Sequence, residues 1–298
     1  MEVIFLGTSQ AVPTETRNHT SILLNYDEEM IMIDCGEGTQ RQFRKMHLNP
    51  CKLTKMLITH WHGDHTLGIP GLLQTLALNN YNRTLDIYGP KGTKRYMDMI
   101  LKMFIFSGDI KLNVHELDRG KFFEHKKFYL EAFPVKHSAA SLAYSFTEKD
   151  RIRIDKKKIK MLGLKGPIIG ELQRGKDITF NGKKIKAKDI TYSKKGKKVA
   201  VVMDTEFCPA CIEAAKNADL LITESTYTNE LADKAKAYQH LTAGQAGTIA
   251  KKAKAKVLYL THISQRFDRN PEVVLKDAKK VFRNTKIAED FMLSLIHI

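Results

Sequence analysis

Three histidines and an aspartate are crowded into six positions, in the stretch from Leu57 to His65 that reads LITHWHGDH. The chain has 11 histidines in 298 residues, so this density is not expected by chance. Imidazole nitrogens and carboxylate oxygens are ligands that suit zinc and similar divalent cations. The stretch therefore predicts a metal site that uses His60, His62, Asp64 and His65.

A second set of candidate ligands stands at the ends of three apolar segments. AFPVKH ends in His137, VAVVMD in Asp204 and VLYLTH in His262. Because strand ends meet at one edge of a sheet, we expect these side chains to join the first four. Seven ligands suffice for two metal ions that share a bridging aspartate. Carboxylates in excess of what one ion needs indicate open catalytic positions rather than a closed structural zinc site.

Short apolar segments separated by turn residues predict the strands that position these ligands. The first three expected strands form a meander, and a helix expected over 68–80 places the histidine cluster in a strand-to-helix loop. The expected strands are 1–7, 21–26, 30–36, 55–60, 84–90, 127–137, 190–205, 219–226 and 256–262. The expected helices are 68–80, 91–104, 209–218, 243–254 and 271–282.

The net charge of +16 comes from 49 Lys and Arg against 33 Asp and Glu, and it is unevenly distributed. The segment from Glu148 to Lys198 holds 18 basic and 6 acidic residues, so it carries +12 of the +16. Such a segment is either a solvated lysine-rich face or a surface for polyanions. The break in composition predicts a basic arm inserted at about 148–198 in a single domain that covers 1–298.

Two function classes are disfavoured by composition. No apolar run reaches the roughly 18 residues of a membrane span, and MEVIFLGTS has no basic leader before the first expected strand, so an intracellular protein is expected. Four cysteines are too few for a disulfide framework in a chain of this size. Cys208 and Cys211 in CPAC have zinc-ligand spacing, but no second pair completes a tetrahedral site, so a local packing role is favoured.

Together, the motifs resemble the metallo-β-lactamase fold and, within it, the RNase Z group of tRNA 3′-processing endonucleases. The histidine cluster alone specifies only the superfamily. The group is indicated by an ordered series of stretches: FLGTSQAVPTETRNHTSILL, IDCGEGTQRQ, THWHGDHTLGIPGLLQT, GLKGPIIGELQRG, MDT, TEST, HLTAGQA and THISQRF. The resemblance implies the α/β class, as a four-layer αββα sandwich with a protruding basic arm.

The resemblance also implies two zinc ions per subunit. One would be held by His60, His62 and His137, the other by Asp64, His65 and His262, with Asp204 bridging. A water of lowered pKa would then be the nucleophile. Asp64 resembles the family's general base. Asp34 in IDCGEG resembles the residue that orders the metal-site loops, with a simple strand-ending turn as the alternative.

Further roles follow from the resemblance alone. His240 in HLTAGQA and Glu224 in TEST resemble the proton donor and its carboxylate partner, although Leu241 replaces the family's serine, and a structural role for both is the alternative. In the family, a Gly-Pro arm between the third histidine ligand and the bridging aspartate grips tRNA. The stretch LKGPIIGELQRGK lies between His137 and Asp204 and so resembles this arm by position. Arg17 and Asn18 in PTETRN resemble the motif near the acceptor stem, with Glu15 where the family has lysine. The expected RNA contacts are Arg17, Asn18, Lys165, Gly166, Pro167 and Arg174.

The implied function is a cytoplasmic, homodimeric, zinc-dependent endoribonuclease that removes the 3′ trailer of precursor tRNA. It would cut after the discriminator nucleotide and leave a 3′-hydroxyl on the tRNA. Two alternatives stay open: a hydrolase of the same superfamily that acts on a small phosphodiester or thioester, and a non-catalytic RNA-binding module. The basic insertion and the pairing of TEST with HLT favour the nuclease.

Overall fold

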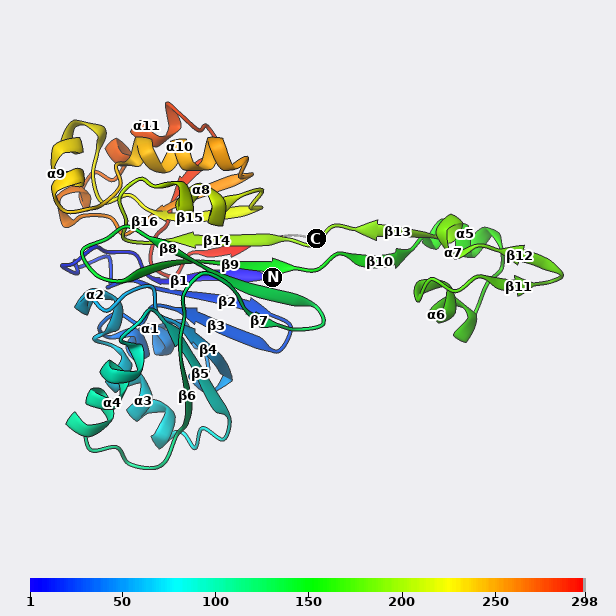
Figure 1. Cartoon of the computed structure of the whole chain (residues 1–298), viewed down its shortest axis with the longest axis horizontal. Helices are drawn as coiled ribbons and strands as arrows, with labels where there is room; N and C mark the ends of the chain where they lie inside the picture. Colours follow the sequence, from blue (N-terminus) through cyan, green and yellow to red (C-terminus); the bar gives the residue numbers. More distant parts are fainter. Residues whose placement is uncertain (297–298) are drawn as a thin grey trace. The chain divides into compact units, whose positions relative to one another are not determined.

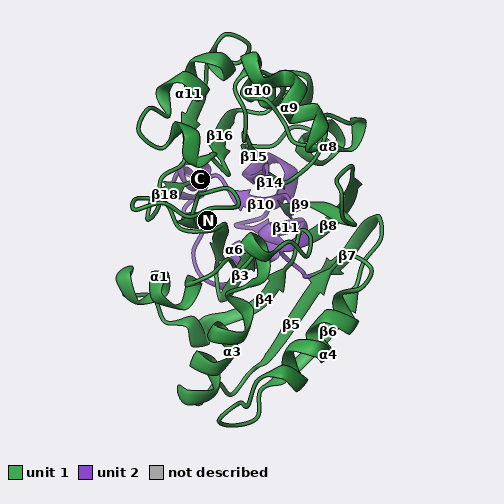
Figure 2. Cartoon of the chain, turned by 90° about the vertical axis from the view of Figure 1, so that its left-hand side faces the viewer, with its two compact units in different colours: residues 1–124, 130–146, 198–298 green, residues 125–129, 147–197 purple. Residues whose placement is uncertain are grey.

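The computed structural model of the chain describes residues 1–296, and contacts divide them into two compact units (Figure 2). The first unit contains Met1–Glu124, Leu130–Phe146 and the chain from Lys198 onward. The second contains His125–Tyr129 and Thr147–Lys197, which includes all of the expected insertion except Lys198. None of the helices in the described residues has the length and apolar character that a membrane span needs.

The first sheet has seven strands in the order β18-β1-β2-β3-β4-β5-β6. Strands β1, β2 and β3 pair antiparallel in sequence, which confirms the expected meander. From β3 to β6 the pairing is parallel. The bounds are β1 (Glu2–Gly7), β2 (Ser21–Tyr26), β3 (Glu29–Ile33), β4 (Leu53–Leu57), β5 (Thr84–Gly89), β6 (Lys111–Glu116) and β18 (Leu293–Leu295).

The second sheet has seven strands in the order β17-β16-β15-β14-β9-β8-β7. Strands β14 to β17 are parallel, so their carboxyl ends share one edge. The bounds are β7 (Gly120–Glu124), β8 (Phe128–Val135), β9 (Ser141–Glu148), β14 (Lys198–Val202), β15 (Leu220–Glu224), β16 (Val257–Thr261) and β17 (Thr285–Ile287).

The two sheets pack face to face, and helices cover their outer faces (Figure 1). Between the sheets, Phe5 of β1 stacks on Tyr259 of β16 at 5.6 Å between ring centroids. Helices α1, α3 and α4 cover the first sheet, and α8, α10 and α11 cover the second. The expected α/β class and αββα layering are confirmed. The bounds are α1 (Thr39–Lys45), α3 (Ile69–Leu78), α4 (Thr93–Met103), α8 (Pro209–Ala215), α9 (Ala232–Ala237), α10 (Ala243–Ala253) and α11 (Glu272–Lys279).

The second unit has its own elements and a small apolar core. Strands β10 (Arg151–Ile154) and β13 (Thr191–Lys194) pair antiparallel, as do β11 (Ile178–Phe180) and β12 (Lys183–Ile185). Three short helices accompany them: α5 (Lys156–Met161), α6 (Pro167–Gln173) and α7 (Ala187–Ile190). The buried core residues are Leu164, Leu172, Ile178, Ile185, Ala187 and Ile190.

The prediction of one long strand over 190–205 was wrong. This segment forms two strands, β13 and β14, that pair in different sheets. Gly196 lies in the break. A Cβ at Gly196 would stand 1.8 Å from the Glu148 carbonyl oxygen, so the two backbones approach too closely for any side chain there. Strands β6 and β7 were not expected, because neither carries a buried apolar face that a sequence pattern would reveal.

Candidate metal centre

Seven side chains of the kinds that bind metals converge where strands of the two sheets end. Those from the first sheet come shortly after β4, and those from the second follow β8, β14 and β16 within two residues. Two of them lie on α2 (Gly63–Thr66), a single helical turn within the stretch expected to be a loop. Their ligand atoms form groups within 4.8 Å of one another. The seven are His60, His62, Asp64, His65, His137, Asp204 and His262.

Three histidines and one oxygen of Asp204 form the first group. His60 Nε2 lies 2.9 Å from His62 Nδ1, and His62 Nδ1 lies 3.2 Å from His137 Nε2. Asp204 Oδ2 is 3.6 Å from His60 Nε2 and 3.8 Å from His137 Nε2. Three ring nitrogens and a carboxylate oxygen around one small space are a donor set that suits tetrahedral zinc.

The second group uses the other oxygen of Asp204. His65 Nε2 lies 3.2 Å from His262 Nε2, and Asp64 Oδ2 lies 3.5 and 3.3 Å from these two nitrogens. Asp204 Oδ1 is 3.2 Å from His262 Nε2 and 3.4 Å from His65 Nε2. The two oxygens of Asp204 therefore face different groups, as a bridging carboxylate requires.

Asp204 tests whether these residues fit metal ions. Its side chain is buried, and among the described residues its Oδ1 has no hydrogen-bond partner. Burial opposes ionisation, but the surrounding histidines, His262 and His65 foremost, hold the pKa of Asp204 well below its usual value. A buried carboxylate oxygen without a partner is costly, and a divalent cation would satisfy it. The site residues therefore fit metal ions.

Asp34 and Thr59 orient two of the histidines from behind. Asp34 Oδ2 lies 2.7 Å from His65 Nδ1, so this nitrogen carries the hydrogen and Nε2 faces the group. Thr59 donates through its hydroxyl to Asp34 Oδ2 (2.8 Å) and therefore accepts from His60 Nδ1 at 3.1 Å. Fixing the ring orientation in this way is how outer hydrogen bonds tune metal ligands. Asp34 thus orders the loops around the site, as the resemblance implied.

Two more outer contacts do the same for the second sheet. His137 Nδ1 lies 3.0 Å from the Gln239 carbonyl oxygen, which can only accept. The Thr226 hydroxyl donates to Glu224 Oε2 (2.7 Å) and therefore accepts from His262 Nδ1 at 3.0 Å. Each histidine consequently directs its Nε2 into the site.

The charges of the site follow from its carboxylates. Burial opposes protonation of His65, but Asp204, Asp34 and Asp64 together raise its pKa well above the usual value. Burial, reinforced by His65, lowers the pKa of His60 well below the usual value. The carboxylates thus hold positive charge here, and binding of a cation would displace the proton of His65.

Glu224 and His240 form a buried pair beside the two groups. Glu224 ends β15, and its carboxylate oxygens lie 3.1 and 3.2 Å from His240 Nδ1. The Thr205 N–H also donates to Glu224 Oε1, at 2.8 Å. Burial opposes protonation, but Glu224 and then Asp204 raise the pKa of His240 to about 9. His240 therefore carries a proton at neutral pH, as a general acid requires.

The residues after His240 explain the departure at Leu241. Leu241 is fully buried in the apolar cluster beneath the second sheet, where a leucine packs better than a serine. Thr242 caps α10: its hydroxyl accepts from the Gln245 N–H, and the Gln245 side chain accepts from the Thr242 N–H. The motif therefore ends in a capping box that starts a helix.

The structure places Arg17 and Asn18 in a loop that reaches Asp64. Arg17 is buried, and its Nη1 donates to Thr8 Oγ1 and the Ala288 carbonyl oxygen, both at 2.7 Å. Asn18 Nδ2 donates to the Glu37 carbonyl oxygen at 2.8 Å. In the same loop, the Ala11 N–H donates to Asp64 Oδ2 at 2.9 Å. Both side chains thus brace a loop that holds Asp64 in place.

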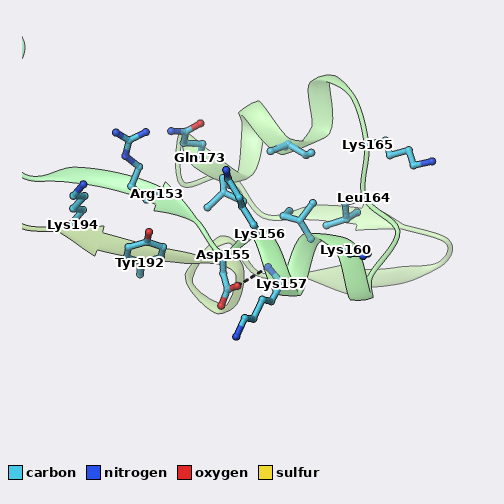
Figure 3. A pocket seen from close by; sticks show the side chains of 13 residues that line it. Arg153, Asp155, Lys156, Lys157, Lys160, Leu164, Lys165, Gln173, Tyr192 and Lys194 are labelled. Atoms are coloured by element: carbon cyan, nitrogen blue, oxygen red, sulfur yellow. Dashed lines mark hydrogen bonds between the residues drawn. The ribbon is translucent and has the colours of Figure 1, made fainter. Parts of the chain in front are cut away.

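The expected RNA contacts of the second unit are exposed at the two ends of α6. Lys165, Gly166 and Pro167 start the helix, and Arg174 ends it. Gly166 has a φ of 73°, which a glycine adopts without strain. This unit has a hollow of about 920 Å³. Its lining includes the basic side chains of Lys156, Lys157, Lys160 and Lys165 (Figure 3).

Comparison with known proteins connects this site to a family. The chain is 44% identical to Ribonuclease Z of Methanothermobacter thermautotrophicus over 98% of its own length and 95% of that protein. It is 39% identical to Ribonuclease Z of Listeria innocua over 97% of both chains. The chain belongs to the ribonuclease Z family. It is accordingly an enzyme, a metal-dependent endoribonuclease, and this confirms the resemblance inferred from its motifs.

Solved structures agree with the ribonuclease Z assignment. The short form of human tRNase Z superposes with a TM-score of 0.74 at 29% identity and covers 100% of both chains. The metallo-β-lactamase fold protein YhfI of Bacillus subtilis superposes with a TM-score of 0.71 at 19% identity, which supports the fold alone. A family model described as anti-Pycsar protein Apyc1 matches residues 1–156. The matches to the ribonuclease Z relatives extend beyond residue 156, over 97% to 98% of the chain.

Several positioning groups of this ribonuclease Z site were not found from the sequence. They are Thr59, Thr226, the Gln239 carbonyl and the Ala11 N–H. Thr59 directly precedes His60, and Thr226 is the last residue of TEST, so a place in these motifs was their only signal. A backbone carbonyl or N–H has no side-chain signature at all.

Proposed function

We propose that this chain is a zinc-dependent endoribonuclease that removes the 3′ trailer of precursor tRNA. It cuts after the discriminator nucleotide and leaves a 3′-hydroxyl on the tRNA. The observation that carries the proposal is Asp204, whose two oxygens face two separate groups of histidines in a member of the ribonuclease Z family. A bridging carboxylate between two three-residue groups is what hydrolysis of a phosphodiester with two cations needs.

Two zinc ions per subunit fit this donor set. One would be held by His60, His62 and His137, and the second by Asp64, His65 and His262, with Asp204 shared. When bound, zinc would lower the pKa of a coordinated water and stabilise charge on the phosphate oxygens. Nitrogen-rich ligands favour zinc over magnesium, which prefers oxygen.

The chain's own residues supply the proton transfers. Asp64 acts as general base: its Oδ2 is oriented by the Ala11 N–H, and His65 and then His262 hold its pKa well below the usual value although burial opposes this. An ionised carboxylate at this position can accept a proton from the attacking water. His240, held protonated by Glu224, delivers a proton to the leaving oxygen. Thr226 keeps Glu224 in place for this step.

The basic arm at about 148–198, inserted in the single catalytic domain, provides the grip on tRNA. Lys165, Gly166, Pro167 and Arg174 are its proposed contacts, and Asn18 is a proposed contact near the acceptor stem. The guanidinium of Arg17 is buried, so Arg17 braces this loop instead of contacting RNA. Lysine and arginine bind phosphates with salt-dependent affinity that is largely independent of sequence. This mode suits a substrate class that shares one shape and differs in sequence. We further propose a cytoplasmic homodimer.

The test is incubation of the purified protein with a 3′-extended precursor tRNA, with and without a chelator, and mapping of the product ends at nucleotide resolution. Cleavage after the discriminator that stops with the chelator and returns with added zinc is expected. Cleavage elsewhere, or cleavage that the chelator leaves unchanged, would contradict the proposal.

The same assay separates the two alternatives. Hydrolysis of bis(p-nitrophenyl) phosphate without cleavage of precursor tRNA would favour a hydrolase of small phosphodiesters or thioesters. Bound zinc and RNA binding without hydrolysis of either substrate would favour a non-catalytic RNA-binding module.

A further inference from the structure

Two buried thiols lie behind the candidate metal centre. Cys208 precedes α8 and Cys211 lies in its first turn, with their Sγ atoms 3.4 Å apart. Cys211 is fully buried, whereas the Cys208 residue is 6% exposed, so Cys208 is the more accessible of the two. Closing the pair into a disulfide of normal bond length brings the sulfurs closer by only about 1.4 Å.

Thr205, which directly follows Asp204, connects the two thiols to the candidate metal centre. Thr205 Oγ1 lies 3.9 Å from Cys208 Sγ and 4.0 Å from Cys211 Sγ. It also accepts from the Lys136 N–H at 3.1 Å, next to His137. The Thr205 N–H donates to Glu224 Oε1, the carboxylate that orients the proposed proton donor. A shift of Thr205 would therefore move or weaken this hydrogen bond to Glu224.

Glu206 makes the second connection. Its carbonyl oxygen accepts from Thr205 Oγ1 (2.7 Å) and faces Cys211 Sγ (3.9 Å). Its carboxylate accepts from Gln239 Nε2 at 3.1 Å, and the Gln239 carbonyl oxygen orients His137. Movement of the thiols thus acts on a ligand and on the proton donor through contiguous hydrogen bonds.

We propose that Cys208 and Cys211 form a reversible redox site whose oxidation to a disulfide slows RNA cleavage. The site itself is independent of the substrate, whereas its effect on cleavage rests on the proposed function. The alternative is the local packing role expected from the sequence. That role requires both thiols to stay reduced in the folded chain.

The oxidant is a small-molecule disulfide of the glutathione class. The Cys208 thiolate attacks one of its sulfurs, forms a mixed disulfide and releases one thiolate. Cys211 then loses its proton and attacks Cys208 Sγ, so the Cys208–Cys211 bond forms and the second small thiol leaves. Two protein thiols are oxidised, and one small disulfide is reduced to two thiols. The hydrogen bond from Cys211 lowers the pKa of Cys208, while this hydrogen bond and burial raise that of Cys211, which suits Cys208 to the first attack.

The test equilibrates the full, folded chain in oxidised and reduced glutathione at several ratios, followed by alkylation of free thiols and proteolysis. The peptide 199–216 contains both cysteines. Its reduced form carries two alkyl groups, whereas its oxidised form carries none and is two hydrogen atoms lighter than the unmodified dithiol. We expect this form to accumulate with the oxidant, and the rate of precursor cleavage to fall several-fold in parallel and recover with dithiothreitol. The double variant Cys208→Ala/Cys211→Ala should keep its rate throughout.

The matched control is Cys35→Ala/Cys51→Ala, which keeps the pair and should respond as the natural chain does. The unfolded chain, equilibrated at the same glutathione ratio, is the reference. If its cysteines are oxidised while peptide 199–216 of the folded chain keeps two free thiols, the proposed redox site is wrong. A disulfide that leaves the rate unchanged would overturn its effect on the centre. If the reduced chain does not cleave precursor tRNA, the proposed function fails, while the peptide mass still decides whether the pair is redox-active.

Discussion

Asp34 is not one of the seven candidate ligands, yet it orients two of them. It contacts His65 directly and acts on His60 through Thr59. Its Oδ2 faces His65 Nδ1, and the same oxygen accepts from the Thr59 hydroxyl, while Oδ1 accepts from the Thr59 N–H. One carboxylate therefore determines which nitrogen of His65, and through Thr59 which nitrogen of His60, faces the metal site. Its φ of 57° shows that the backbone turns sharply at this point.

Asp34→Asn should weaken zinc binding by about 10-fold to 100-fold, because the amide cannot accept at both positions. Zinc affinity measured by chelator competition checks this. Asp98→Asn on the exposed face of α4, where the carboxylate pairs with Lys102, is the control and should leave affinity unchanged. An Asp34→Asn protein with natural zinc affinity would contradict the role of Asp34.

Asp64→Ala should abolish cleavage of precursor tRNA while RNA binding is largely kept, since the exposed basic residues lie elsewhere. Product formation and filter binding of the same labelled precursor measure the two properties. A fully active variant would exclude Asp64 as the base.

Glu224→Gln keeps the size of the side chain but removes the charge that raises the pKa of His240. We expect kcat for precursor tRNA to fall by about 10²-fold to 10⁴-fold with a smaller change in KM, as for loss of a general acid. His240→Ala should have a similar effect, and the double variant should be no worse than either single one because the two residues act as a unit. Additive losses would argue for separate roles.

The convergence of the candidate ligands was predictable at this scale because each stands at a strand end or in the loop that follows one. The groups that orient them were not. Thr226 lies in TEST, two residues after Glu224, but only folding brings its hydroxyl to His262 Nδ1. Arg17 resembled an RNA contact by motif, yet its guanidinium is buried against Thr8 and Ala288, a position that only the folded chain reveals.

At the scale of elements, the strands of the second unit allow a clean removal of its basic part. Ile154 of β10 pairs with Thr191 of β13 at the point where the chain leaves the ladder. Replacing residues 155–190 by Asn-Gly would join the two strands as a two-residue hairpin. Cleavage of precursor tRNA should fall sharply, whereas hydrolysis of bis(p-nitrophenyl) phosphate should be kept. Equal loss of both activities would indicate a structural role for the arm.

A charge-only version of this experiment keeps the arm folded. Lys156, Lys157 and Lys160 are changed to Gln, and the slope of log affinity against log salt should become shallower by about 0.7 to 0.9 for each lost phosphate contact. The matched control changes three exposed lysines of the first unit, Lys251, Lys276 and Lys279. Equal slopes in the two variants would exclude phosphate contacts by these three lysines of the arm.

Element prediction from the sequence succeeded where apolar periodicity was strong. The helix expected over 91–104 is α4 (Thr93–Met103), and that over 243–254 is α10 (Ala243–Ala253). It failed where one continuous pattern served two sheets, as in β13 and β14. The helices of the second unit were not foreseen, because their six-residue apolar core is hidden among lysines.

For the whole molecule, metal removal tests whether the site contributes to stability. Ligands from both sheets would be tied together by bound cations, so chelation should lower the unfolding midpoint. By mass action, zinc at about 100 times its Kd adds about 3 kcal/mol to the free energy of unfolding. Thermal scans with chelator and with added zinc measure the shift. Asp204→Asn should show little shift, and an equal shift in that variant would place the stabilising metal elsewhere.

The order of the strands along the chain has a consequence for biosynthesis. On the ribosome, β4 and the histidine cluster emerge early, but Asp204 and His262 emerge only after the second unit has been made. Strand β18 then adds to β1, pairing Leu295 with Glu2. A nascent chain therefore passes through much of its synthesis with four or five of the seven candidate ligands made. It cannot cleave RNA near the translating ribosome until nearly the whole described sequence has been released from the exit tunnel.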